Sequence, residues 1–130
     1  MRIPFEFVLD ELAAVEPRTR RIFMATGVYV GEKIVFILNE SEKYKQDHGV
    51  WIATGKEHHE SLRKALPSMK NIDLLGKDTH WQNLPSSGPD FEREVARACA
   101  LVVAGDPRIG RVPQRVKARK KRAARGRPQR

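Results

Sequence analysis

The chain has 130 residues and a formal charge of +9, and this length is enough for one domain whose hydrophobic core needs no disulfide or metal ion. Its single cysteine, Cys99, excludes an internal disulfide. No stretch approaches the roughly 18 apolar residues of a membrane span, and no signal-peptide pattern follows the first methionine. We therefore expect a cytoplasmic protein without a transmembrane segment.

The positive charge is concentrated at the C-terminal end of the chain. Residues 111–130 contain ten lysines and arginines and no acidic residue, which leaves 15 basic against 16 acidic residues in 1–110. We therefore predict a nearly neutral folded domain at residues 1–110 and a basic tail at residues 111–130. Because the tail has few apolar residues, we expect about its last eighteen residues to be disordered when nothing is bound.

The first predicted element is an N-terminal helix, which Pro17 ends. Apolar residues recur at helical spacing along one face, and the other face is acidic. The apolar stripe consists of Phe5, Val8, Leu9, Leu12 and Ala13. Residues 18–21, three of them arginines, then suggest a short solvated connection.

Residues 22–38 form the most apolar stretch of the chain and predict two strands joined by a turn at residues 31 and 32. In the first strand, residues 22–30, Gly27 predicts a bulge or a close approach of backbone. The second strand, residues 33–38, has five consecutive apolar residues. We therefore expect both faces of this strand to be covered at least in part.

The middle of the chain predicts a loop, a strand and a helix. Residues 39–49 are polar and indicate an exposed loop, in which Tyr44 suggests a short extension of strand pairing. Residues 50–53 predict a third strand. Thr54 and Glu57 match the capping-box pattern, which predicts the start of a second helix.

The remaining residues predict two short strands and a helix. Ile72, Leu74 and Leu75 favour a fourth strand, residues 76–78 a turn, and residues 79–84 a fifth strand.

The last predicted helix has Ser87 as its candidate N-cap and Pro89 near its first position, and Gly105 ends it. Its apolar stripe is the most regular in the chain. The stripe consists of Phe91, Val95, Ala98, Cys99 and Val102.

The predicted order is α-β-β-β-α-β-β-α, which indicates an α+β fold with about five strands and three helices. Through residues 20–23, 27–34 and 81–85, the chain resembles the TfoX N-terminal domain family of small, mostly uncharacterised bacterial proteins over roughly residues 5–104. Met24 and Ala25 stand where that family usually has two glycines. The resemblance implies a two-layer, secretion-chaperone-like fold with an antiparallel sheet packed on helices, frequent pairing into a homodimer, and little chemistry.

Few side chains indicate catalysis or metal binding. The histidines lack the spacing of a zinc site, because the adjacent His58 and His59 would point about 100° apart on a helix. Cys99 is expected to be buried rather than nucleophilic. We therefore predict no metal site, no cofactor and no catalytic residue. An acid-base site would require three polar residues to share a pocket: Asp73, Asp78 and His80.

The tail is the strongest electrostatic feature of the sequence. Lysines and arginines on a flexible segment neutralise phosphates and release counterions, which gives affinity for nucleic acid without reading its base sequence. The tail has no aromatic residue on which bases would stack. The predicted nucleic-acid-binding residues are Arg115, Lys117, Arg119, Lys120, Lys121, Arg122, Arg125 and Arg127.

Three functions stay open at this point. The first is a non-catalytic binding or regulatory module whose tail touches nucleic acid nonspecifically. The second is a protein-interaction or dimerisation domain that adds a strand at an open sheet edge, with a tail that only aids solubility. The third is a small enzyme of unknown reaction.

Overall fold

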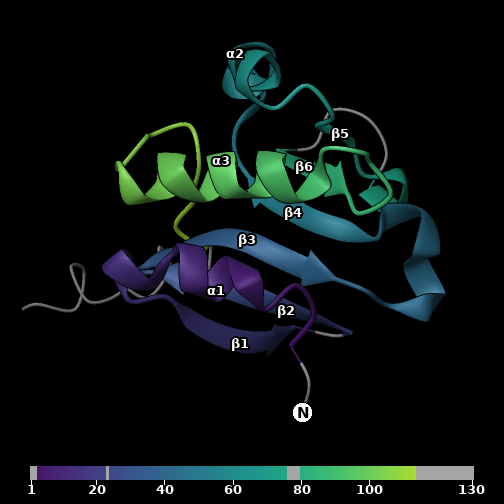
Figure 1. Ribbon diagram of the computed structural model, residues 1–130, viewed down its shortest axis with the longest axis horizontal. Helices are drawn as coiled ribbons and strands as arrows, with labels where there is room; N and C mark the ends of the chain where they lie inside the picture. The colour runs from purple at the N-terminus through teal and green to yellow at the C-terminus, as the bar shows by residue number, and fades with distance from the viewer. Residues whose placement is uncertain (1–2, 23, 76–79, 114–130) are drawn as a thin grey trace, which may run out of the picture.

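A computed structural model describes residues 3–22, 24–75 and 80–113 and has the predicted α+β architecture (Figure 1). Six antiparallel strands of the described part form one sheet in the order β1-β2-β3-β4-β6-β5. The strands are β1 (Arg18–Ile22), β2 (Ala25–Val30), β3 (Lys33–Asn39), β4 (Gly49–Ala53), β5 (Lys70–Asn71) and β6 (Trp81–Pro85). The helices are α1 (Phe7–Glu11), α2 (His59–Ala65) and α3 (Phe91–Val103), and short 3-10 turns are η1 (Ala13–Val15), η2 (Glu42–Asp47), η3 (Lys56–His58) and η4 (Asp73–Leu75).

Helices α1 and α3 lie on the same face of the sheet, and the main hydrophobic core lies between these helices and the strands (Figure 1). The apolar stripe predicted for α3 is confirmed, whereas the one predicted near the N-terminus is confirmed only in part: α1 is shorter than predicted, a 3-10 turn follows it before Pro17, and Ala13 is exposed. Val8 and Leu12 from the N-terminal segment, and Val95 and Cys99 from α3, are fully buried in one cluster with Phe36 of β3. Burial of these stripes, rather than helix propensity, stabilises a helix as short as α1.

The N-terminal edge of the sheet differs from the prediction. Residues 18–21, predicted as a solvated connection, belong to the edge strand β1, which pairs with β2 along its whole length. The prediction was wrong because an edge strand is held by backbone hydrogen bonds, which leave its arginine side chains in solvent. The single strand predicted at residues 22–30 is accordingly two strands, one ending at Ile22 and one beginning at Ala25.

The hairpin formed by β2 and β3 confirms the predicted turn at residues 31 and 32. The bulge predicted at Gly27 lies elsewhere: Gly27 pairs with Ile37, and the register shift between Val28 and Tyr29 leaves Val35 of β3 as the extra residue. A Cβ atom at Gly27 would lie 2.6 Å from Cδ1 of Ile22. The group that approaches Gly27 is therefore a side chain of β1 and not backbone.

Residues 39–49 are only in part the exposed loop that their polarity predicts. The exposed residues of the segment are Glu40, Glu42, Lys43, Lys45 and Gln46. The segment contains η2 and buries the polar side chains of Asn39, Ser41 and Asp47. Tyr44 lies within η2 and does not extend strand pairing. The prediction missed these three residues because each buried side chain forms hydrogen bonds, which removes most of the cost of burying it.

The second helix is confirmed, but its predicted capping box is not. The hydroxyl of Thr54 donates a hydrogen bond to the backbone carbonyl of Arg108, 2.6 Å away. No side chain caps the turn η3 that begins after Gly55. The Thr54 hydroxyl therefore bonds to a residue distant in sequence and does not cap the helical turn that follows it.

The fourth strand is shorter than predicted and lies earlier in the chain, at Lys70–Asn71. Leu74 and Leu75 lie instead in η4, where they are 46% and 41% exposed. A few apolar residues in succession do not distinguish a strand from a 3-10 turn. The fifth strand is confirmed as β6, whereas the turn predicted at residues 76–78 lies outside the described residues.

The last helix is confirmed and ends as predicted at Gly105, whose φ of +75° favours glycine. The N–H of Asp106 donates to the carbonyl of Leu101, 3.0 Å away, which completes the glycine-type helix end. The start of the helix differs from the prediction. Asp90, and not Ser87, precedes its first residue and makes no side-chain cap.

Beyond α3 the chain returns to the sheet. The N–H of Gly110 donates to the carbonyl of Ala53, 2.7 Å away, and Arg111 exchanges two backbone hydrogen bonds of 2.9 and 3.0 Å with Ile34. Arg111, the first residue of the predicted tail, is therefore part of the folded domain. The eight predicted nucleic-acid-binding residues all follow position 113 and lie outside the described residues. In the described part, no helix has both the length and the apolar character to cross a bilayer.

Candidate ligand-binding pocket

The sheet has a second face, opposite α1 and α3. Because side chains alternate along a strand, some apolar side chains of the sheet lie on this face. Phe36 and Leu38 of β3 are buried in the core on the helix side. Ile37, between them, points the other way because successive side chains of a strand alternate. Ile37 lies directly opposite Trp51 of β4 in the strand register, so an aliphatic and an aromatic side chain lie next to each other on this second face.

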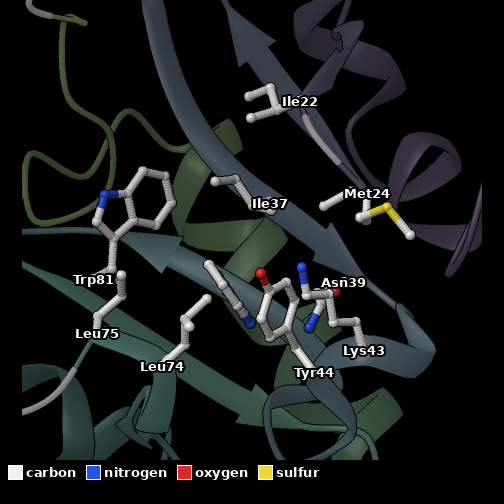
Figure 2. A pocket seen from close by; sticks show the side chains of 11 residues that line it. Ile22, Met24, Ile37, Asn39, Lys43, Tyr44, Leu74, Leu75 and Trp81 are labelled. Atoms are coloured by element: carbon white, nitrogen blue, oxygen red, sulfur yellow. The ribbon is translucent and has the colours of Figure 1, made fainter.

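A pocket of about 700 Å³ opens on this face (Figure 2). In the close-up, Lys43, Tyr44 and Met24 lie toward one side of it and Trp81 toward the other. Most of its lining side chains are apolar or aromatic, and in the part of the chain that the structure describes none of them is Asp, Glu, His or Cys. The lining residues are Ile22, Met24, Ala25, Ile37, Asn39, Lys43, Tyr44, Trp51, Leu74, Leu75 and Trp81.

Asp47 joins three of the segments that form the pocket. Its side chain is fully buried, and its carboxylate accepts the backbone N–H groups of Asp73 at 2.7 Å and Leu74 at 2.9 Å. Its backbone carbonyl accepts the Asn39 amide and the Trp51 indole N–H, each at 2.9 Å. One residue of η2 therefore fixes η4, the end of β3 and the ring of Trp51 relative to each other.

The loop that carries Lys43 and Tyr44 is held by further short-range hydrogen bonds. The Asn39 side-chain oxygen accepts the N–H of Ser41 at 3.1 Å, and the Ser41 hydroxyl accepts the N–H of Lys43 at 3.2 Å. A ring nitrogen of His48 lies 2.7 Å from the Ser41 carbonyl. The pocket side that carries Lys43 and Tyr44 is therefore held by a hydrogen-bonded turn.

The β1 side of the pocket depends on Gly27. Because Gly27 has no side chain, Ile22 packs over it, 2.6 Å from where a Cβ atom would be. Tyr29 approaches the same position to 3.1 Å. Gly27 thus makes room for the side chain of Ile22, which lines the pocket.

Two of the histidines considered for metal binding, His48 and His59, each have a ring nitrogen close to a backbone carbonyl oxygen. His48 belongs to the loop around Ser41. Burial lowers the pKa of His59 below its ordinary value, and a ring nitrogen of His59 lies 3.4 Å from the His80 carbonyl. Within residues 3–22, 24–75 and 80–113, no three His, Cys, Asp or Glu residues are grouped so that they could hold a metal ion.

The other candidate reactive groups also lie outside the pocket. Cys99 is buried in the core as predicted, and burial raises the pKa of its thiol to about 12, which keeps it in the poorly nucleophilic protonated form. The side chains of Asp73 and His80 are exposed and do not line the pocket. Asp78 lies outside the described residues.

Two features of the sequence point in part to this pocket. The five apolar residues of β3 indicated that the second face is covered, and this is where Ile37 contributes to the pocket. The strands predicted at residues 50–53 and 79–84 each contain a tryptophan, Trp51 and Trp81, and both line the pocket. The role of Asp47 was missed, because a lone aspartate in a polar segment looks the same whether it is solvated or buried.

Comparison of the chain with protein-family models, with curated protein sequences and with solved structures found no match. The resemblance to the TfoX N-terminal domain family therefore stays a prediction.

Proposed function

We propose that this chain is a non-catalytic binding module whose specific site is the pocket on the second face of the sheet. The observation that carries the proposal is the concentration of apolar side chains around one open cavity of about 700 Å³. Cavities of roughly 300 to 1,000 Å³ with apolar and aromatic walls are typical of small-molecule sites. Among the residues that the structure describes, the pocket lining has no carboxylate, imidazole or thiol for acid-base or nucleophilic chemistry, which favours binding over catalysis.

Exposure at the rim supports the same proposal. In the described part of the chain, four large apolar residues are strongly exposed, and three of them, Met24, Leu74 and Leu75, line this pocket. Apolar side chains gathered at one place on a surface mark binding sites, whereas scattered ones do not. The fourth, Val103, is 40% exposed at the end of α3 and lies outside the pocket.

A titration with N-phenylnaphthylamine, a neutral dye that fluoresces in apolar surroundings, tests the proposal. The double variant Leu74→Ser/Leu75→Ser should weaken dye binding about tenfold, since each replacement removes exposed apolar contact area of the rim. Val103→Ser is the matched control, because it removes a similarly exposed apolar side chain elsewhere. Equal dye affinity in both variants would contradict binding in the pocket.

We propose a second function, nonspecific contact of the tail with nucleic acid. It is supported by the charge distribution, since ten basic and no acidic residues follow position 110 while the rest of the chain is nearly neutral. If all eight predicted residues from Arg115 to Arg127 neutralise duplex phosphates, the logarithm of the affinity should fall with the logarithm of salt concentration with a slope of about −7. Changing these eight residues to glutamine should abolish both the binding and its salt dependence.

The three arginines of β1 provide the control for that experiment. Arg18→Gln, Arg20→Gln and Arg21→Gln together remove positive charge from the folded domain and leave the tail intact. If this triple variant lost as much nucleic-acid affinity as the tail variant, the tail would not be the binding segment.

A further inference from the structure

The pocket has few polar side chains. They differ in whether they already form hydrogen bonds within the protein, which we call used, or are free to bond to a ligand, which we call available. Asn39 is used, because its amide donates to the Asp47 carbonyl and its oxygen accepts the Ser41 N–H. The hydroxyl of Tyr44 has no hydrogen bond to any residue that the structure describes. Figure 2 shows this hydroxyl directed toward the space that the lining side chains surround.

Lys43 is the second available group, and among the described lining residues it alone carries a formal charge. Its ammonium nitrogen lies 5.6 Å from the centre of the Tyr44 ring. The two available polar groups therefore belong to neighbouring residues and lie on the same side of the pocket. Lys43 makes no ion pair with a carboxylate in the described part of the chain. Lys45, two residues on, pairs with Glu42 at 3.0 Å, so its charge is already partnered and it does not line the pocket.

These two groups specify the polar end of a ligand. A lysine ammonium only donates hydrogen bonds, and a phenol can donate one, so both are satisfied by an acceptor with two oxygens and a negative charge. A carboxylate has this chemistry. The rest of the lining offers indole and aliphatic surfaces, which favour an apolar or aromatic body.

We propose that the ligand of this pocket is an apolar carboxylic acid, bound with its carboxylate at Lys43 and Tyr44 and its body against Ile37, Trp51 and Trp81. This inference rests on the pocket being the binding site, as proposed above. The acid is ionised at neutral pH, so its charge opposes the unpaired charge of Lys43. An uncharged ligand of the same shape keeps the apolar contacts and loses the ion pair.

The test compares naphthoic acid with naphthamide, which has the same shape without the charge, as competitors of N-phenylnaphthylamine on the full chain at neutral pH. The acid should compete about fivefold better than the amide, which is the upper range for an exposed ion pair. Lys43→Met should remove that preference, which is measured as the ratio of acid to amide competition and so does not depend on the dye affinity of the variant itself. Lys45→Met, the matched control, should keep the preference, and Tyr44→Phe should reduce it.

The outcomes separate the two proposals. Equal competition by acid and amide in the unmodified chain would overturn the carboxylate assignment, provided the rim variants still weaken dye binding. A preference for the acid that persists in Lys43→Met would also overturn it, because the basic tail, which is unchanged in every variant, would then be holding the anion. Dye binding that is insensitive to the rim variants would overturn the pocket itself.

Discussion

Replacing Asp47 is the most informative single change for the organisation of the pocket. Its carboxylate is fully buried and accepts two backbone N–H groups of η4, at 2.7 and 2.9 Å. In Asp47→Ala both acceptors are lost, whereas the bonds from Asn39 and Trp51 remain because they use the backbone carbonyl. The variant therefore removes the attachment of η4 and leaves the position of the Trp51 ring intact.

The expected magnitude follows from these two hydrogen bonds. Hydrogen bonds to a charged acceptor contribute about 1.5 to 3 kcal/mol each, and η4 is exposed enough for water to replace part of them. We expect Asp47→Ala to lower the free energy of unfolding by about 2 to 4 kcal/mol. Asp47→Asn keeps one acceptor oxygen and places an amide donor opposite the second N–H, so we expect a loss of about 1 to 2 kcal/mol.

Urea unfolding followed by tryptophan fluorescence measures both losses, and titration with N-phenylnaphthylamine measures the pocket. Dye affinity should fall in Asp47→Ala because Leu74 and Leu75 are no longer held at the rim. Asp73→Ala, which changes an exposed side chain on the same turn, should stay within about 0.5 kcal/mol of the unmodified chain. If Asp47→Ala were as stable as this control, our interpretation of Asp47 would be refuted.

Three further predictions concern groups outside this cluster. Because burial raises the pKa of Cys99 to about 12, an aromatic disulfide reagent should label its thiol only after unfolding in urea, and rapid labelling of the native chain would contradict its placement. The hydrogen bond from Arg108 lowers the pKa of Asp106, so the pair should contribute about 1 kcal/mol of stability that is present above the ordinary aspartate pKa of 3.8 and is lost as the pH falls through the lower pKa of the folded state. Asp106→Asn should show no such loss, and equal acid sensitivity of both chains would exclude the pair as its cause. Gly27→Ala should destabilise the chain by about 1 kcal/mol, and Ile22→Ala in the same chain should cost less than it does alone, because it removes the side chain that the new methyl group meets.

Self-association through a sheet edge receives little support from the two edge strands. All four of the residues 18–21 on β1 are exposed and three are arginines, so antiparallel pairing of two such edges would bring like charges together. The other edge, β5, has only two residues. These two edge strands therefore do not favour the homodimer by strand addition that the sequence suggested.

The parts of the fold that sequence predicts well are those fixed by local periodicity. The stripe from Phe91 to Val102 specifies α3, because residues three and four apart share one face of a helix whatever the rest of the chain does. The hairpin around Gly31 and Glu32 is equally local. Both are confirmed by the structure.

The errors occur where a distant partner decides the local structure. Thr54 matches a helix cap but donates to Arg108, 54 residues away. The arginines of residues 18–21 look solvated and are solvated, yet their backbone completes an edge strand. Neither outcome is visible in a window of neighbouring residues.

The pocket could be predicted only in fragments for the same reason. Its walls come from β1, β2, β3, β4, η2, η4 and β6, and their convergence depends on the strand order. The buried carboxylate of Asp47 reaches residues 26 and 27 positions away. Composition indicates that β3 has two covered faces, but only the topology shows that the second face is hollow.

The most direct test of the pocket uses the two tryptophans of the chain, both of which line it. Heteronuclear NMR of the full chain shows one indole N–H signal for each, and these signals can be followed while naphthoic acid is added. Our account predicts that the signals of Trp51 and Trp81 shift together and saturate, while the backbone amide of Ala98, buried in the core on the other side of the sheet, does not move. Saturable binding that leaves both indole signals unchanged would contradict the account.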